Sequence, residues 1–453
     1  MNIAIEEHFR CPKGYFDFAP RGPLSEQAQF FSFGAGNTCY GRRWVGAPNG
    51  QQNAKAYDAA TDVQVQGTKC FLPFDPTEVA HNLRRERYPV PGSHRGVSAE
   101  VVRRAYYALR PLLPVHIRKH LQRRALRGWK SGSTFPSWPV DRSVDAMFEK
   151  LLLLSLKLHN SESVPFIWFW PEGKQGCIVM THDVETAAGL RSCDDLAALD
   201  NVFGVKSSFQ LIPGARYTVT PEILDSLRSR GFEVNIHDLT HDGSLFQNPK
   251  EFVESAARIN QYAAQWKTRG FRSGSLYRNP EWYDCFDLDY DMSIPNVGRL
   301  DPQRGGCCTL MPYFIGKILE IPVTTTQDYS LFHIMNEYSI APWIHQLEHI
   351  LKGNGLASFI IHPDYVAGGR SLLTYTHLLE HLQKVRSESN AWMALPGEVN
   401  QWWRERNKMS LVRKDQNWEI EGPGQERARI AYAHVKNGEL AYSVCPLVMA
   451  AAS

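Results

Sequence analysis

The sequence predicts an α/β protein whose main domain is a (β/α) barrel of seven or eight strands. Three observations lead to this class. Short apolar or β-branched runs recur after residue 165, most of the segments between them can form a helix, and polar residues gather just after the runs. Because a barrel brings the carboxyl ends of its parallel strands to one face, these polar residues would meet there.

The order of the elements supports a barrel more than an open sheet. The expected strands are residues 177–181, 207–212, 233–236, 270–273, 290–294, 319–323, 357–361 and 392–395. The expected helices between them are residues 221–230, 249–268, 341–352 and 372–387. This alternation is typical of βα units around a parallel sheet, and eight runs are the number that closes one.

The barrel is expected to span residues 165–403, with further segments on both sides. Residues 1–164 form an irregular α+β extension with two helices at 98–109 and 114–129. Residues 404–453 read as a small antiparallel β appendage around the turn "KNG". The sequence therefore predicts one large barrel domain with two appended parts.

Composition excludes several classes of protein. The chain has 453 residues, of which 43% are hydrophobic, and a net charge of +3, so it can bury a large core and shows no overall bias toward nucleic acid. Nine scattered cysteines do not resemble a disulfide framework and favour a reducing compartment. The first twenty residues lack a secretory pattern, and "MFEKLLLLSLKLH" is too short and charged to span a bilayer. We expect a cytoplasmic protein.

One segment is strongly basic. Residues 84–130 carry eleven arginines and two lysines against two glutamates. A basic amphipathic helix can lie on an anionic membrane surface or contact phosphates, and it can equally be the solvated face of a helix packed on the main domain. Peripheral membrane contact therefore stays an open expectation, without a transmembrane segment.

The stretch "HDLTH" places His237 and His241 four residues apart, which lets both reach one ion if the chain turns helically after the strand. Catalytic zinc commonly takes three protein ligands and leaves a fourth position for water. Either Glu185 or Asp183 could be the third ligand, and the other carboxylate would then be placed for general-base work, because residues i and i+2 of a strand point the same way.

Four short motifs in this order resemble those of the polysaccharide deacetylase superfamily. They are "THDVE" after the first strand, "HDLTH" after the third, "FRSG" at the fourth and "IIHPD" at a late strand, and the resemblance covers about residues 165–400. It implies a deacetylase-type (β/α) barrel, often distorted or one strand short. It also implies removal of acetyl groups from amino sugars with a divalent metal, frequently Zn²⁺.

The resemblance also implies residue roles. They are Asp183 as general base, His237 and His241 as metal ligands, Arg272 as the partner of the base, and His362 as general acid. Arg272 could instead simply bridge barrel strands, and His362 could be a structural residue at a strand end.

The chain departs from the family pattern at one metal ligand. The common pattern has two adjacent aspartates, base then ligand, and Val184 occupies the second place here. The third metal ligand is therefore assigned to Glu185. If Glu185 pointed away, Asp183 would have to bind the metal and no obvious base would remain. The proline usual near Arg272 is also missing, and residues 289–296 stand about where a Trp-bearing motif is expected.

The sequence thus predicts a metal-dependent hydrolase that removes an acetyl or other acyl group from an amino sugar or glycan precursor. Two alternatives remain. A metal-dependent phosphohydrolase would explain the His-Asp pairs at His182, His237 and His241, although "IVMTHD" reads as a strand where such enzymes use helices. A carbohydrate-binding barrel without a metal would explain the substitution at Val184.

Overall fold

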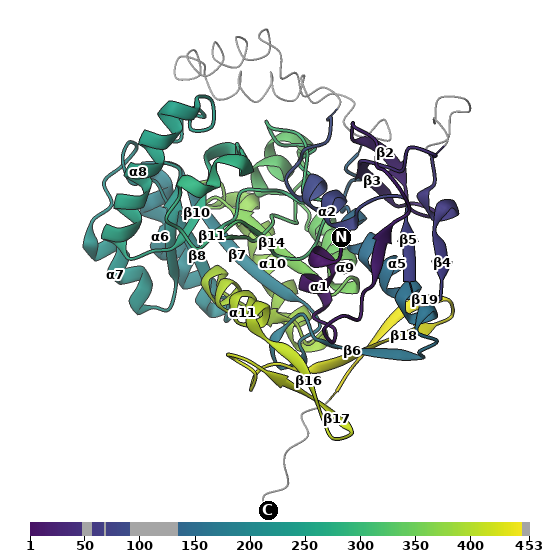
Figure 1. Cartoon of the computed structure of the whole chain (residues 1–453). Coiled ribbons are helices and arrows are strands. Elements are labelled where there is room, and N and C mark those ends of the chain that lie inside the picture. The colour runs from purple at the N-terminus through teal and green to yellow at the C-terminus, as the bar shows by residue number, and fades with distance from the viewer. Residues whose placement is uncertain (48–56, 68, 91–134, 446–453) are drawn as a thin grey trace, which may run out of the picture. The chain divides into compact units, whose positions relative to one another are not determined.

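The computed structural model describes residues 1–47, 57–67, 69–90 and 135–445. The two helices expected at 98–109 and 114–129, and most of the basic segment 84–130, lie outside these residues. The described chain divides into two compact units. Figure 1 labels the helices and strands along the chain. Unit 1 contains Met1–Tyr88, Arg142–Lys174 and Gln401–Ser453, and unit 2 contains Pro89–Asp141 and Gln175–Asn400.

Unit 1 is a mixed α+β assembly with small sheets. Its helices are α1 (Ile3–Phe9), α2 (Pro76–Arg84) and α5 (Ser143–Leu158), with the short 3-10 helices η1 (Ala59–Asp62) and η2 (Pro171–Gly173). Its strands are β1 (Phe18–Pro20), β2 (Gln29–Ser32), β3 (Thr38–Gly41), β4 (Gln64–Gln66), β5 (Lys69–Leu72), β6 (Ser163–Ile167), β16 (Ser410–Lys414), β17 (Asn417–Glu421), β18 (Ile430–Lys436) and β19 (Glu439–Val444). Strand β18 pairs antiparallel with both β19 and β6, so the sheet joins the C-terminal hairpin to a segment far earlier in the chain.

Unit 2 consists of alternating strands and helices. Its strands are β7 (Cys177–Val184), β8 (Ser207–Leu211), β9 (Glu233–His237), β10 (Gly270–Arg272), β11 (Tyr290–Asp291), β12 (Tyr313–Ile315), β13 (Ile318–Glu320), β14 (Leu356–Ile361) and β15 (Trp392–Met393). Its helices are α6 (Ala187–Val202), α7 (Pro221–Ser229), α8 (Pro249–Trp266), α9 (Ala341–Lys352) and α10 (Gly369–Glu388), with the short helices η3 (Gly274–Leu276), η4 (Pro280–Cys285) and η5 (Ser330–Met335). Helix α11 (Pro396–Lys408) begins in unit 2 and continues into unit 1.

The strands of unit 2 form one curled, mostly parallel sheet in the order β12-β13-β11-β10-β9-β8-β7-β14, and β15 also pairs with β7. Only the β12–β13 pair is antiparallel. The segment after β13 lies against β14, because Thr325 N–H donates to Ser358 O at 3.3 Å and Ser358 N–H donates to Thr324 Oγ1 at 2.9 Å. These bonds join the segment after β13 to β14, so the sheet curls into a half-barrel of the deacetylase (β/α) barrel type, as the sequence predicted.

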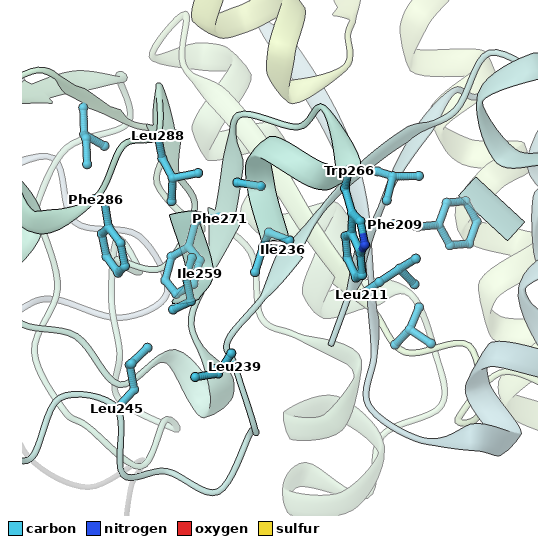
Figure 2. Packing of buried hydrophobic residues seen from close by; sticks show 14 of the residues in the cluster. Phe209, Leu211, Ile236, Leu239, Leu245, Ile259, Trp266, Phe271, Phe286 and Leu288 are labelled. Atoms are coloured by element: carbon cyan, nitrogen blue, oxygen red, sulfur yellow. The ribbon is translucent and has the colours of Figure 1, made fainter. Parts of the chain in front are cut away.

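Helices cover the sheet through two large apolar clusters. One cluster packs α7 and α8 on strands β8 to β10, and Figure 2 shows Ile236, Phe271, Ile259 and Trp266 within it. The other packs α9 and α10 on β7 and β14. Burying a large apolar side chain contributes about 1.5–3 kcal/mol each, so these clusters fix the strand register and hence the carboxyl ends of the strands.

All eight expected strands and all four expected helices of the barrel are present. The run at 290–294 becomes the two-residue strand β11 because side chains replace part of its ladder. The N–H of Ser293 donates to Asp291 Oδ2 at 3.3 Å, and the N–H of Ile294 donates to Glu320 Oε1 at 2.9 Å. In the part of the chain that the structure describes, no helix is both long and apolar enough to cross a bilayer.

Candidate active site

Strand β7 delivers two carboxylates to the same place. Asp183 is its penultimate residue and Glu185 follows its last residue, so the two side chains share one face of the strand. The intervening Val184 points to the other face and is fully buried in the apolar cluster with α7 and α8. Because side chains alternate along the strand, Glu185 faces the neighbouring histidines and Val184 does not.

Glu185, His237 and His241 form a compact group. One ligand atom from each lies within 4.8 Å of the others. Among the described residues, no other three His, Cys, Asp or Glu side chains come together in this way. His241 Nε2 is 2.9 Å and His237 Nε2 is 4.0 Å from Glu185 Oε1. Neither Nε2 atom makes a hydrogen bond of acceptable geometry with any described residue, although both imidazoles are buried. Buried nitrogens that converge on a carboxylate without hydrogen bonds fit a metal ion.

Between the two histidines the backbone makes a turn that contains residues in the left-handed conformation. The helical turn that their spacing suggested is not formed. Asp238 has φ +58° and His241 has φ +54°. The carboxylate of Asp238 stabilises this turn, since it accepts hydrogen bonds from Leu239 N–H at 2.6 Å and Gly274 N–H at 3.0 Å. A Cβ at Gly274 would lie 2.4 Å from Asp238 Oδ2, so only glycine allows this approach.

The tautomer of His237 is set by a backbone carbonyl. Its Nδ1 lies 3.1 Å from Arg272 O, at the end of the neighbouring strand β10, and an N–H there can donate to the carbonyl. This leaves the Nε2 lone pair facing Glu185. Metal-binding histidines usually have such a partner on the second nitrogen, so the arrangement is preorganised for an ion.

Asp183 is paired with a buried arginine. Arg272 Nη1 lies 3.2 Å and 3.3 Å from its two carboxylate oxygens, and Nη2 donates to Thr181 Oγ1 at 3.2 Å. Burial would raise the pKa of Asp183, but the charge of Arg272, with help from His237 and His362, outweighs it and lowers the pKa below its ordinary value. Asp183 is therefore ionised at neutral pH and able to accept a proton.

His362 is paired with a buried carboxylate that sequence reasoning missed. Asp328 Oδ1 lies 2.6 Å from His362 Nδ1, and Asp328 Oδ2 accepts the backbone N–H of His362 at 2.7 Å. Burial would lower the pKa of His362, but the Asp328 carboxylate and Glu185 raise it well above its ordinary value. The other nitrogen, Nε2, lies 3.4 Å from Glu185 Oε1, so the imidazole borders the group of Glu185, His237 and His241.

The loop after β8 contacts the backbone at Glu185 and at His241. Arg216 Nη2 donates to His241 O at 2.6 Å, and its Nη1 lies 3.4 Å from Glu185 O. The neighbouring Tyr217 hydroxyl donates to Val184 O at 2.5 Å and accepts from Ile212 N–H at 2.8 Å. This loop ties the end of β7 to the left-handed turn at His241.

The structure thus brings together Asp183, Glu185, His237, His241, Arg272 and His362, which are the six residues that the sequence singled out. His182 does not join them. Its Nε2 lies 2.8 Å from the buried Asp200 on α6, which also accepts from Ser207 and Tyr375. The His-Asp sequence at 182–183 is therefore not a shared ligand pair, because its two side chains point to opposite faces of β7.

Asp328 and Arg216 were missed for different reasons. Asp328 follows the run at 319–323, so the rule that polar residues gather at strand ends could have found it. Arg216 acts through main-chain oxygens, and its position in a loop carries no sequence signal for that contact.

Comparison with known proteins gives matches to solved structures alone. No protein-family model matches the chain, and no curated protein matches it. The chain is similar to a Mycobacterium smegmatis protein described as a polysaccharide deacetylase, with 15% identity, 55% of this chain and 98% of that chain covered, and a TM-score of 0.43. The peptidoglycan deacetylase PdaC of Bacillus subtilis matches at 11% identity, with 51% and 92% covered and a TM-score of 0.33. The allantoinase PuuE matches at 12%, with 52% and 92% covered and a TM-score of 0.39.

Proposed function

We propose that the chain is a metal-dependent amide hydrolase that removes an acetyl group from an amino sugar or glycan precursor. The proposal rests on one observation: a cluster of three side chains and two pairs of side chains meet at the strand ends of one barrel. They are the Glu185, His237 and His241 cluster, the Asp183 and Arg272 pair, and the His362 and Asp328 pair. The choice of an acetylated sugar as substrate rests on the motif resemblance.

Glu185, His237 and His241 would hold the metal. Two imidazoles and one carboxylate are a ligand set that suits Zn²⁺ and leaves a position open. When bound, the metal would lower the pKa of a water molecule and polarise the amide carbonyl.

Asp183 would act as the general base. Its Oδ2 lies 3.9 Å from His237 Nε2, beside the cluster. The charge of Arg272, which is not a member of the cluster, favours the ionised form of Asp183. It would accept one proton of the attacking water as the water oxygen bonds to the carbonyl carbon. Thr181 supports this pair, since its hydroxyl donates to Phe359 O at 2.6 Å and accepts from Arg272.

His362 would act as the general acid. Its Nε2 proton would pass to the amide nitrogen as the carbon–nitrogen bond breaks, which releases acetate and a free amine. Asp328 orients the ring through Nδ1 and the backbone N–H, and it stabilises the protonated form. Proton exchange with solvent would then restore the charged imidazole and the ionised Asp183.

Acetate release tests this proposal directly. Apoprotein loaded with Zn²⁺ is incubated with N-acetylglucosamine and its oligomers, and acetate and free amine are measured against apoprotein without metal. We expect equal amounts of acetate and amine in the loaded sample alone. Phosphate release from phosphorylated sugars in the same panel would instead support a phosphohydrolase. Sugar binding without turnover would support a carbohydrate-binding barrel.

Replacing Asp328 by Asn should lower kcat while metal binding persists. Asn keeps the shape of the side chain but removes the negative charge that orients His362 and stabilises its protonated form. We expect a loss of roughly 10–100-fold, the size of effect seen when carboxylates that hold metal-binding imidazoles are replaced. Steady-state kinetics and metal analysis provide the measurement, with the exposed Asp225→Asn as matched control. An unchanged kcat would remove Asp328 from the proposed machinery.

Replacing Arg216 by Gln should weaken metal binding by about 10–100-fold, because outer-shell contacts to ligand residues have effects of this size. Arg216 donates to His241 O, and His241 has a left-handed backbone that needs outside support. Competition with a chromophoric chelator gives the metal Kd. Arg258→Gln, at an exposed position of α8, is the control. Equal metal affinities in the two variants would show that the loop does not position His241.

A further inference from the structure

A second pair of histidines lies on the outer surface of the barrel, on helix α9. His345 and His349 are four residues apart and both are exposed, whereas Trp343, Leu347 and Ile350 of the same helix are buried. The two Nε2 atoms are 3.1 Å apart, and the ring centroids are 4.6 Å apart. One imidazole can therefore donate its Nε2–H to the Nε2 of the other in the metal-free protein, and an ion would take the place of that proton.

The separation of these nitrogens suits a shared ion. Zn–N bonds are about 2.0–2.1 Å long, and tetrahedral geometry then places two ligand nitrogens about 3.3–3.4 Å apart. The observed 3.1 Å differs from this by a few tenths of an ångström, which small side-chain rotations supply. Residues i and i+4 on a helix face the same way, so α9 itself holds the two rings in place.

Glu348 adds a negative charge near the two histidines along the sequence of α9. It is exposed and lies one residue before His349, so the helix reads H-x-x-E-H from His345 to His349. Glu348 also acts electrostatically on His381 of α10, whose pKa is lowered mainly by partial burial. The negative charge of Glu348 would favour a cation on this surface.

We propose that His345 and His349 form a surface site for a divalent transition-metal ion that prefers imidazole nitrogen, such as Zn²⁺, Ni²⁺ or Cu²⁺, with water filling its remaining positions. Mg²⁺ and Ca²⁺, which prefer oxygen ligands, would not bind there. The H-x-x-E-H spacing on a helix also provides zinc ligands and a base in some metallopeptidases. Here both histidines are exposed, and no third ligand atom from His, Cys, Asp or Glu joins them within 4.8 Å among the described residues.

Counting bound zinc tests the surface site. Apoprotein is dialysed to equilibrium against ZnCl₂, and ions per chain are measured by mass spectrometry. We expect two ions in the wild type and one in His349→Ala. The variant should fold, because the position is exposed and alanine favours helix. Zinc content of His349→Ala equal to that of the wild type would overturn the proposal.

His377→Ala is the matched control. His377 is exposed on α10 and is four residues from His381, but no ring contact joins the two among the described residues, so this variant should keep two ions. The variant His241→Asn separates this inference from the proposed function. In that background the remaining ion should be lost on adding His349→Ala. If it is retained, the surface site is wrong, whatever the cluster at Glu185 binds.

Discussion

Replacing Asp183 by Asn should reduce kcat/KM for amide hydrolysis by about 10²–10⁴-fold, the contribution that a general base typically makes. Asn has nearly the shape of Asp but cannot accept the proton of the attacking water. The metal should stay bound, because the proposed ligands are Glu185, His237 and His241, and Asp183 is held by Arg272. Steady-state kinetics on the zinc-loaded variant provide the measurement.

Two controls accompany this variant. Arg272 is fully buried, so removing the charge opposite it could lower stability as well as activity. Thermal unfolding of the variant therefore has to show a folded protein at the assay temperature. Asp225→Asn, at an exposed position of α7, should retain wild-type kinetics. Full activity of the folded Asp183→Asn variant would mean that another group takes the proton.

Replacing His241 by Asn should abolish activity and metal binding at the cluster together. Asn tolerates the left-handed backbone found at His241, with φ +54°, better than Ala does, so the turn is kept while the imidazole is lost. Removing metal from the wild type with a chelator should have the same effect on activity. Added Zn²⁺ should restore the wild type and fail to restore the variant.

Activity that survives in His241→Asn, or in chelated wild type, would contradict a metal-dependent mechanism. The exposed His377→Asn on α10 is the matched control and should behave as wild type throughout. Because stability could also change, unfolding of the apo forms of both variants has to be compared.

Much of the barrel could be predicted because its strands are buried on both faces and read as continuous apolar runs. Strand β7 illustrates this, since all eight of its residues are buried. The alternation of side chains along the same strand also explains why Glu185, and not Val184, could be assigned to the histidines. The two-residue period of a strand is a local property, so the face on which each side chain lies can be predicted from the sequence alone.

The remaining parts of the site depend on long-range contacts. Asp328 meets His362 across 34 residues, and Arg216 meets His241 across 25. The turn that places His241 depends on Gly274, which belongs to a different strand end. The distance along the chain between the partners follows no general rule, so the sequence does not reveal these contacts. They form only when the sheet brings the strand ends together.

In the proposed site Glu185 binds the metal, which leaves Asp183 free as the base. The most direct test is the zinc content of Glu185→Ala and Asp183→Asn, both in a His349→Ala background so that the α9 surface contributes no ion. We expect about one ion per chain in Asp183→Asn and none in Glu185→Ala. Zinc that survives in Glu185→Ala and is lost in Asp183→Asn would make Asp183 the ligand and contradict the proposed mechanism.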